Sequence, residues 1–234
     1  MTVKQFDTGQ GQYHFELSDF VTEFHSHPTI EVLLATQGTF SIKSKAKEWQ
    51  AIQMAVVDRN LAHQVNASNC QLTVLMFEPH LRSPDFDVMG IPLSEGIFAQ
   101  SILENPEEQI EKLIEHTEIK KASNLDPRVL TCLSYLQQHT PDYAELIDKL
   151  QDLVHLSESR LSHLFSQEMG LSLKKYLVWT RLRTCISLVL HQNESLFGAA
   201  LTAGFYDQAH LSRAFKEMLG MPPSQAYNSR TLQE

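Results

Sequence analysis

Short runs of apolar and β-branched residues, separated by turn residues, occupy the chain from Tyr13 to Phe77. The runs read YHFEL, IEVLLA, TFSIKS, MAVV and LTVLMF, and the breaks between them fall at Gly38, at SKAKE, at residues 58–60 and at residues 66–69. Strand-forming runs with turn residues roughly every 8–12 positions are typical of antiparallel sandwiches and barrels. The pattern therefore predicts an antiparallel β-barrel in this region.

After this region the spacing of the apolar residues changes from that of strands to that of helices. Residues 79–96 contain three prolines and two glycines and indicate an irregular connector. From Ile97 onward the spacing predicts helices almost throughout. We therefore predict an α+β chain with two domains, in which an N-terminal β domain spans 1–96, a connector helix and linker span 97–125, and an all-α domain spans 126–234.

The connector contains an amphipathic helix over residues 106–119. Ile110, Leu113, Ile114 and Thr117 fall on one helical face, and the opposite face is acidic. This apolar face either packs on the barrel or forms a dimer seam. The segment 122–127 after it reads as a linker that ends with Asp126 as the N-cap of the next helix and Pro127 at its first position.

Two stretches in the second half, 146–172 and 196–224, repeat one pattern. Each predicts a short helix, a tight turn and a second helix that ends at a glycine, with Ser157 and Asp207 as the N-caps and Gly170 and Gly220 as the ends. The apolar positions of the two second helices correspond: Leu161, Leu164 and Phe165 in the first, Leu211, Ala214 and Phe215 in the second. This is helix-turn-helix geometry, in which the second helix of each pair enters a major groove.

Residues 173–191 between these stretches predict one long helix, with Ser172 as its N-cap. This helix would hold the two second helices so that they read major-groove faces about 34 Å apart. Arg can bond guanine, Gln can bond adenine and Ser can serve either, whereas Lys suits phosphates. Side chains opposite the apolar faces are the candidate DNA contacts, with the phosphate candidates last: Ser159, Ser162, His163, Ser166, Gln208, Ala209, Ser212, Arg213, Lys174, Lys175 and Lys216.

The formal net charge of −9 argues at first against a nucleic-acid partner. The charge is uneven, however: residues 1–125 carry 9 basic and 17 acidic side chains, whereas residues 155–230 carry 8 basic and 5 acidic ones. The acidity of the first half therefore does not exclude DNA binding by the second. Three widely spaced cysteines without a CxxC pair, and no long apolar run, fit a cytoplasmic protein with no membrane partner.

Residues 127–228 resemble the DNA-binding domain of the AraC/XylS family of transcription regulators. The matching positions are Ser157, Leu161, Phe165, Gly170, Ser172, Tyr176, Leu177, Arg181, Leu182, Ala200, Gly204, Phe205, Leu211, Ser212, Arg213, Phe215, Lys216, Gly220 and Pro223. The chain departs from the family at Gln151, His155 and His163, where Ala, Gly and Arg are usual, so the first unit is expected to bind DNA weakly or through phosphates. The resemblance implies double-stranded promoter DNA and RNA polymerase as partners, a small-molecule or metal effector, and a homodimer.

The first half contains the pattern His25-x-His27-x₃-Glu31, followed by His63 on a later run. Positions 25, 27 and 31 share a parity, so their side chains can converge on one face of an extended chain. Imidazoles and a carboxylate with open positions suit a divalent metal such as Zn, Fe, Ni or Mn. The pattern resembles the first metal-binding motif of the cupin superfamily, a family of small β-barrels.

Three interpretations of this cluster remain open: a metal site, a metal-free pocket that hydrogen-bonds an organic ligand, and satisfied buried histidines. The second cupin motif is only partly present, because Asp58 and Asn60 replace the usual Pro and Gly. For the whole chain we expect a DNA-binding transcription regulator without enzyme activity. A metal-dependent cupin enzyme with a helical appendage, or a protein-binding module with degenerate helix-turn-helix units, are the alternatives.

Overall fold

A computed structural model describes residues 2–226 except 82, 87–88, 94–95, 103, 116 and 119–124. The chain forms two compact units. The first contains Met1–Lys121 together with Phe215–Glu234, and the second contains Ala122–Ala214. Residues 122–124 of the predicted linker lie outside the described residues. No described helix is long and apolar enough to cross a membrane.

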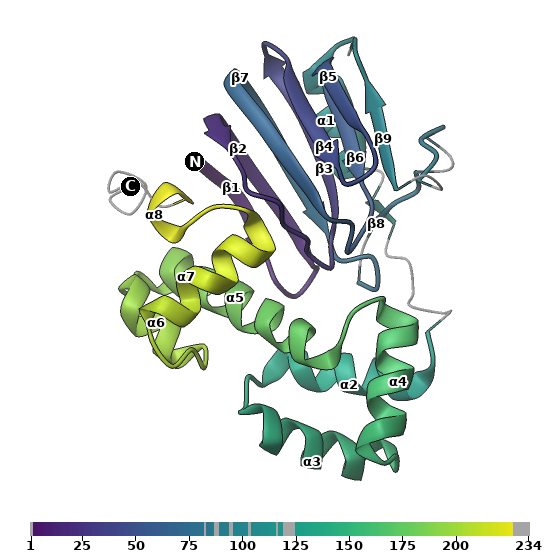
Figure 1. The fold of residues 1–234 in the computed structure, drawn as a ribbon, viewed down its shortest axis with the longest axis vertical. Helices are drawn as coiled ribbons and strands as arrows, with labels where there is room; N and C mark the ends of the chain where they lie inside the picture. The colour runs from purple at the N-terminus through teal and green to yellow at the C-terminus, as the bar shows by residue number, and fades with distance from the viewer. Residues whose placement is uncertain are drawn as a thin grey trace. The chain divides into compact units, whose positions relative to one another are not determined.

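The first unit is built on an antiparallel sheet (Figure 1). Its strands are β1 Thr2–Asp7, β2 Gln12–Val21, β3 Ile30–Gln37, β4 Phe40–Ser44, β5 Glu48–Ile52, β6 Met54–Val57, β7 His63–Phe77 and β9 Ile97–Gln100. The order is β1-β2-β7-β3-β6-β9, and β4 pairs with β5 and β7. Short strands β8 (Ser83–Pro84) and β10 (Thr117–Glu118) pair separately. The α+β class is confirmed, but the pairings among the described residues leave β1 and β9 as ends and do not close a barrel.

Helix α1 (Pro106–Glu115) packs its apolar face on this sheet. Leu113 is fully buried, and Ile110 and Ile114 pack against a core formed by Ile30, Val32, Leu34, Met54, Val56, Leu75, Phe77, Phe86 and Ile91. Of the two roles predicted for this face, packing on the sheet is the one that the structure shows. Fully burying a leucine side chain is worth roughly 1.5–3 kcal/mol, so Leu113 holds α1 on the sheet.

The structure corrects three sequence-based predictions. Residues Ile97–Gln100 form a strand rather than a helix, because the fully buried strand β6 requires a second hydrogen-bonding neighbour and pairs with β9. Residues 66–69 do not break the sheet, because β7 continues through them with Ala67 buried between exposed neighbours. The connector helix ends at Glu115 instead of residue 119, and Thr117 lies in β10.

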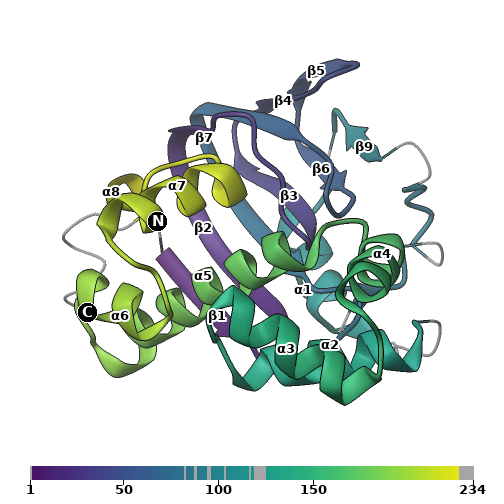
Figure 2. The same cartoon turned by 60° about the horizontal axis from the view of Figure 1, so that its bottom comes forward.

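The second unit is helical (Figure 2). Its helices are α2 Pro127–Gln138, α3 Tyr143–Val154, α4 Glu158–Met169, α5 Leu173–Gln192 and α6 Leu196–Thr202. Helix α7 (Gln208–Leu219) begins in this unit and ends in the first, and α8 is Pro223–Ala226. The expected caps at Asp126 and Ser172 are present, since each side chain accepts a hydrogen bond from a backbone N–H of the first turn.

Candidate metal centre and DNA-binding helices

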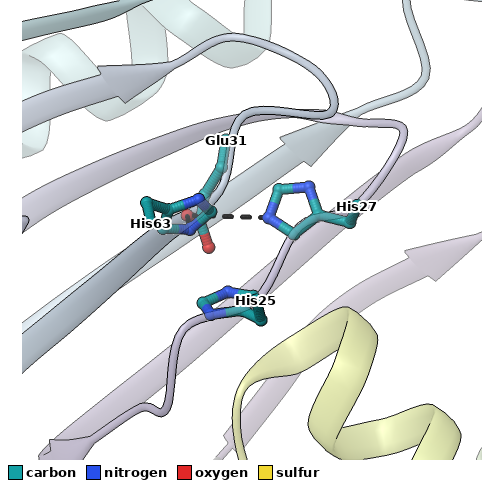
Figure 3. Close-up of side chains that lie close together, drawn as sticks. All are labelled: His25, His27, Glu31 and His63. Carbon is teal, nitrogen blue, oxygen red and sulfur yellow. Dashed lines mark ion pairs between the residues drawn. The ribbon is translucent and has the colours of Figure 1, made fainter. Parts of the chain in front are cut away.

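His25, His27, Glu31 and His63 converge in the first unit (Figure 3). His25 and His27 lie between β2 and β3, Glu31 lies on β3, and His63 begins β7. Mutual backbone hydrogen bonds of 3.0 Å join His25 to His63 and bring these distant segments together. All four residues are buried, and one potential ligand atom from each lies within 4.8 Å of the others.

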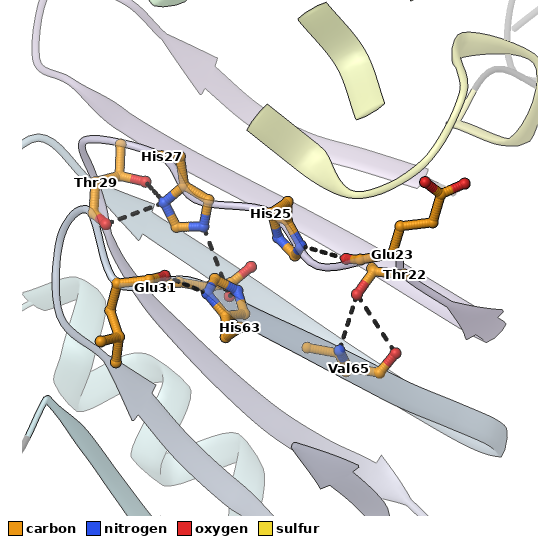
Figure 4. Close-up of polar contacts among 9 residues, drawn as sticks. Thr22, Glu23, His25, His27, Thr29, Glu31, His63 and Val65 are labelled. Atoms are coloured by element: carbon orange, nitrogen blue, oxygen red, sulfur yellow. Dashed lines mark hydrogen bonds and ion pairs between the residues drawn. The ribbon is translucent and has the colours of Figure 1, made fainter. Parts of the chain in front are cut away.

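Backbone carbonyl groups orient all three imidazole rings (Figure 4). The Nδ1 atoms of His25, His27 and His63 lie 3.0, 3.1 and 2.9 Å from the carbonyl oxygens of Glu23, Thr29 and Leu61. A carbonyl oxygen only accepts, so each Nδ1 carries the proton in the neutral ring and each Nε2 presents a lone pair. Metal-binding histidines are characteristically held in this way.

Burial and neighbouring charges shift the pKa values of His25, Glu31 and His63 in different directions. Burial, together with the neighbouring His63 and His27, lowers the pKa of His25 to about 3, so its ring is neutral at ordinary pH. Burial alone would raise the pKa of Glu31, but His27 and His63 outweigh it and hold that pKa well below the usual range. Burial also opposes protonation of His63, yet the Glu31 carboxylate raises the pKa of His63. The cluster thus holds a carboxylate among rings that can supply neutral nitrogen ligands.

The donor atoms of this cluster fit a divalent cation. His63 Nε2 and His27 Nε2 lie 3.0 and 3.8 Å from Glu31 Oε2, and with the proton on each Nδ1 neither Nε2 has an N–H to donate to this carboxylate. Unsatisfied buried polar atoms are costly and call for a missing partner. Zinc bonds to histidine nitrogen and carboxylate oxygen are about 2.0–2.2 Å long. Two ligand atoms on opposite sides of one zinc ion are therefore separated by about two bond lengths, which is close to the 4.8 Å that limits the distances among these four atoms.

The two predicted helix-turn-helix units are present. The first consists of α3 and α4, and the second of α6 and α7. Of the apolar positions matched between α4 and α7, five are buried and Leu164 is half-buried. None of the candidate DNA contacts is buried: Ser159, His163, Gln208, Ala209, Arg213, Lys174 and Lys216 are exposed, and Ser162, Ser166, Ser212 and Lys175 are half-buried. Their roles in DNA binding stay predictions.

The departures at Gln151 and His155 have structural explanations. The Gln151 side-chain oxygen accepts a 2.9 Å hydrogen bond from the backbone N–H of Glu158, at the start of α4. Ser157 occupies the N-cap position but makes no side-chain cap hydrogen bond. His155 adopts the left-handed conformation, with φ of 52°, that a glycine would otherwise supply in this turn. The sequence contained no signal for the role of Gln151, which depends on the tertiary turn.

We expect Gln151→Ala to destabilise the protein by about 1 kcal/mol because it removes a helix N-terminal hydrogen bond. Ser157→Ala should cost less, since that side chain makes no cap hydrogen bond. Urea-induced loss of helical circular dichroism would measure both. The reverse order would contradict the assignment of the cap to Gln151.

Three other residues acquire contacts that the sequence pattern did not indicate. The Thr29 hydroxyl lies 2.7 Å from His27 Nδ1 and adds to the orientation of that ring. Lys216 Nζ lies 2.9 Å from Glu23 Oε1 within the first unit. Arg181 is buried, and its guanidinium donates to the Pro141 carbonyl oxygen at 2.5 Å. Arg181 therefore fastens α5 to the α2–α3 connection.

Comparison with known proteins gives consistent matches. Residues 150–229 match the model of a helix-turn-helix domain family. The arabinose operon regulatory protein of Escherichia coli K12 is 28% identical over 151 residues, which are 63% of this chain and 51% of that protein. The probable transcriptional regulator LumQ of Photobacterium leiognathi is 22% identical over 237 residues, which cover 91% of this chain and 94% of LumQ. The chain spans about half the length of the arabinose operon regulators that it matches.

The fold also resembles a solved structure. ToxT from Vibrio cholerae O395 superimposes with a TM-score of 0.59 at 12% identity, covering 92% of this chain and 95% of ToxT. At this identity the likeness concerns the fold alone. The structural match thus covers both the sheet-rich N-terminal part and the helical C-terminal part of this chain.

Proposed function

We propose that the protein is a transcription regulator of the AraC type, which its helix-turn-helix half resembles, and that it binds specific DNA sequences and regulates transcription in response to an effector. The observation that carries this proposal is the paired arrangement of α4 and α7. Each helix buries its apolar face and leaves the candidate base contacts accessible. Basic residues exceed acidic ones between 155 and 230, which favours the same interpretation.

A selection from a random duplex library with the purified chain tests this function. We expect a recurrent motif, and an affinity for that motif that falls steeply as salt rises, because phosphate contacts release counterions. Enrichment of no motif, with weak binding that is equal for all duplexes, would contradict sequence-specific regulation and favour a protein-binding module.

The effector that we propose is a divalent cation held by His25, His27, Glu31 and His63. Three rings with Nε2 lone pairs, a buried carboxylate and unsatisfied donor atoms support a metal over satisfied buried histidines. A bound cation would supply positive charge and fix these four side chains. The same residues could serve a metal-dependent cupin enzyme, but the relatives named as regulators favour sensing.

Elemental analysis and calorimetry test the effector. Protein stripped with a chelator should take up about one Zn(II), Mn(II), Ni(II) or Fe(II) per chain and unfold at a higher temperature. At a free-metal concentration 100 times Kd, the expected stabilisation is about 2.7 kcal/mol. Clean apo protein that takes up none of these cations would remove the metal and leave the organic ligand as the candidate.

Two partners complete the proposed function. A homodimer would let one assembly span two promoter half-sites, and RNA polymerase is the partner expected of a regulator that activates. The apolar face of α1 is used within the chain. We therefore place dimer contacts on another surface, and analytical ultracentrifugation with and without Zn(II) measures the assembly directly.

A further inference from the structure

The segment Thr22–Ser26 contacts the C-terminal end of α7 within the first unit. The backbone N–H of Glu23 donates to the Gly220 carbonyl oxygen at 2.7 Å, and the N–H of Ser26 donates to the Glu217 carbonyl oxygen at 3.2 Å. The last carbonyl groups of a helix lack partners inside the helix. The segment that carries His25 therefore caps the end of α7.

Gly220 brings the backbone directly against the metal centre. Its φ is +70°, and a Cβ at this position would lie 2.5 Å from His25 Nδ1, 2.6 Å from Thr22 Cβ and 2.8 Å from the Glu23 carbonyl oxygen. No side chain fits there without displacing this segment. Residue 220 is thus packed against a candidate metal ligand as well as hydrogen-bonded beside it.

Both ends of this segment are fixed to β7 (Figure 4). The Val65 N–H donates to Thr22 Oγ1 at 2.8 Å, and the Thr22 N–H donates to the Val65 carbonyl oxygen at 2.9 Å. At the other end, His25 pairs with His63. The peptide groups around Glu23 lie between these two attachments, so the orientation of the His25 ring and the position of Glu23 are mechanically linked.

A short chain of contacts connects the metal centre to α7. His25 Nδ1 donates to the Glu23 carbonyl oxygen, while the N–H of Glu23 donates to Gly220 and the Glu23 carboxylate pairs with Lys216. A cation on His25 Nε2 would hold the ring in its present orientation. The same bond would then restrain Glu23 and, through it, residues 216–220.

We propose that Thr22–Ser26 couples occupancy of the metal centre to the C-terminal end of α7, so that a bound cation strengthens this contact and keeps Lys216 on Glu23. This inference rests on the proposed metal centre. Lys216 is a candidate phosphate contact, so Glu23 and DNA compete for its ammonium group. The cation therefore reduces the electrostatic contribution of Lys216 to DNA binding.

Hydrogen exchange of the full chain tests the contact without any substitution. Adding Zn(II) to the stripped wild-type protein should slow exchange of the amides at 216–221 several-fold. Zn(II) binding with no change in exchange at these amides would overturn the coupling and leave the metal centre intact. Absence of Zn(II) binding would overturn the metal centre, and the coupling with it.

Two glycine variants test the reverse direction, because coupling between two sites is reciprocal. Gly220→Ala introduces a Cβ against His25 and should weaken Zn(II) binding at least fivefold in calorimetry. Gly90→Ala is the matched control, since Gly90 has φ of +68° and nothing within 4 Å of its Cβ position. Equal Zn(II) affinities for the two variants would count against the coupling.

Glu23→Gln removes the carboxylate that pairs with Lys216 and leaves the backbone hydrogen bonds of the segment in place. In the wild type, Zn(II) should reduce the salt dependence of binding to a selected duplex by about one phosphate contact, a change of about 0.9 in the slope of log K against log salt. In Glu23→Gln this Zn(II)-dependent change should disappear. A Zn(II)-dependent change of the same size in both proteins would overturn the competition for Lys216.

Discussion

Replacing His63 by alanine should weaken binding of a divalent cation more than 100-fold. His63 is fully buried, supplies an Nε2 atom 3.0 Å from Glu31 and anchors the segment that carries His25. Loss of residues that merely support metal ligands typically costs 10–100-fold, and loss of a ligand should cost more. Calorimetry with Zn(II) and elemental analysis after dialysis measure the effect.

His80→Ala is the control for this substitution. His80 is also a buried histidine of the first unit near a carboxylate, with Nε2 3.6 Å from Glu78, but it lies outside the cluster. The Zn(II) affinity of the His80→Ala protein should match that of the wild type. Because His63→Ala also leaves a cavity, Glu31→Gln serves as a second variant that preserves shape and removes the anionic ligand. Wild-type affinity in both His63→Ala and Glu31→Gln would exclude this site.

Replacing Arg213 by alanine should cost about 1–3 kcal/mol of specific DNA binding, which corresponds to roughly 5–150-fold in Kd. Arg213 is exposed on α7, opposite the buried side chains of Leu211 and Ala214. A guanidinium in a major groove can make two hydrogen bonds to one guanine. A repeat of the selection should therefore show a relaxed preference at a single base position.

Arg128→Ala is the control, because Arg128 is an exposed arginine at the start of α2 that forms a 2.7 Å ion pair with Asp126. It lies outside both helix-turn-helix units, so base preference should not change. If Arg213→Ala weakens binding to all duplexes equally and lowers the salt dependence, Arg213 contacts a phosphate instead of a base.

The sequence predicted those features that depend on local pattern. The helix-turn-helix units, the caps at Asp126 and Ser172 and the convergence of His25, His27, Glu31 and His63 all follow from spacings within a few residues or from one motif. Asn60, which replaces the usual glycine of the second cupin motif, adopts the left-handed conformation in the turn before His63. In each of these cases the local chemistry and the tertiary structure favour the same conformation.

The features that the sequence did not predict depend on distant partners. Strand β9 forms because β6 needs a neighbour, although four residues carry no period that distinguishes a strand from a helix. Gln151 acts as a cap through a hydrogen bond that spans seven positions, from within α3 to the start of α4. The contact of Lys216 with Glu23 spans 193 positions, which no pattern in the sequence could indicate.

The carbonyl groups that orient the three imidazoles each belong to a residue only two positions away along the chain. Such short-range restraints keep the rings close to their ligating orientation before an ion arrives, so the ordering that the ion still imposes is confined to the rings themselves and to the segment around Glu23. A site prepared in this way can fill and empty while the surrounding fold stays intact. Its occupancy would then follow the free concentration of the ion from moment to moment, whereas a structural zinc is retained for as long as the protein remains folded.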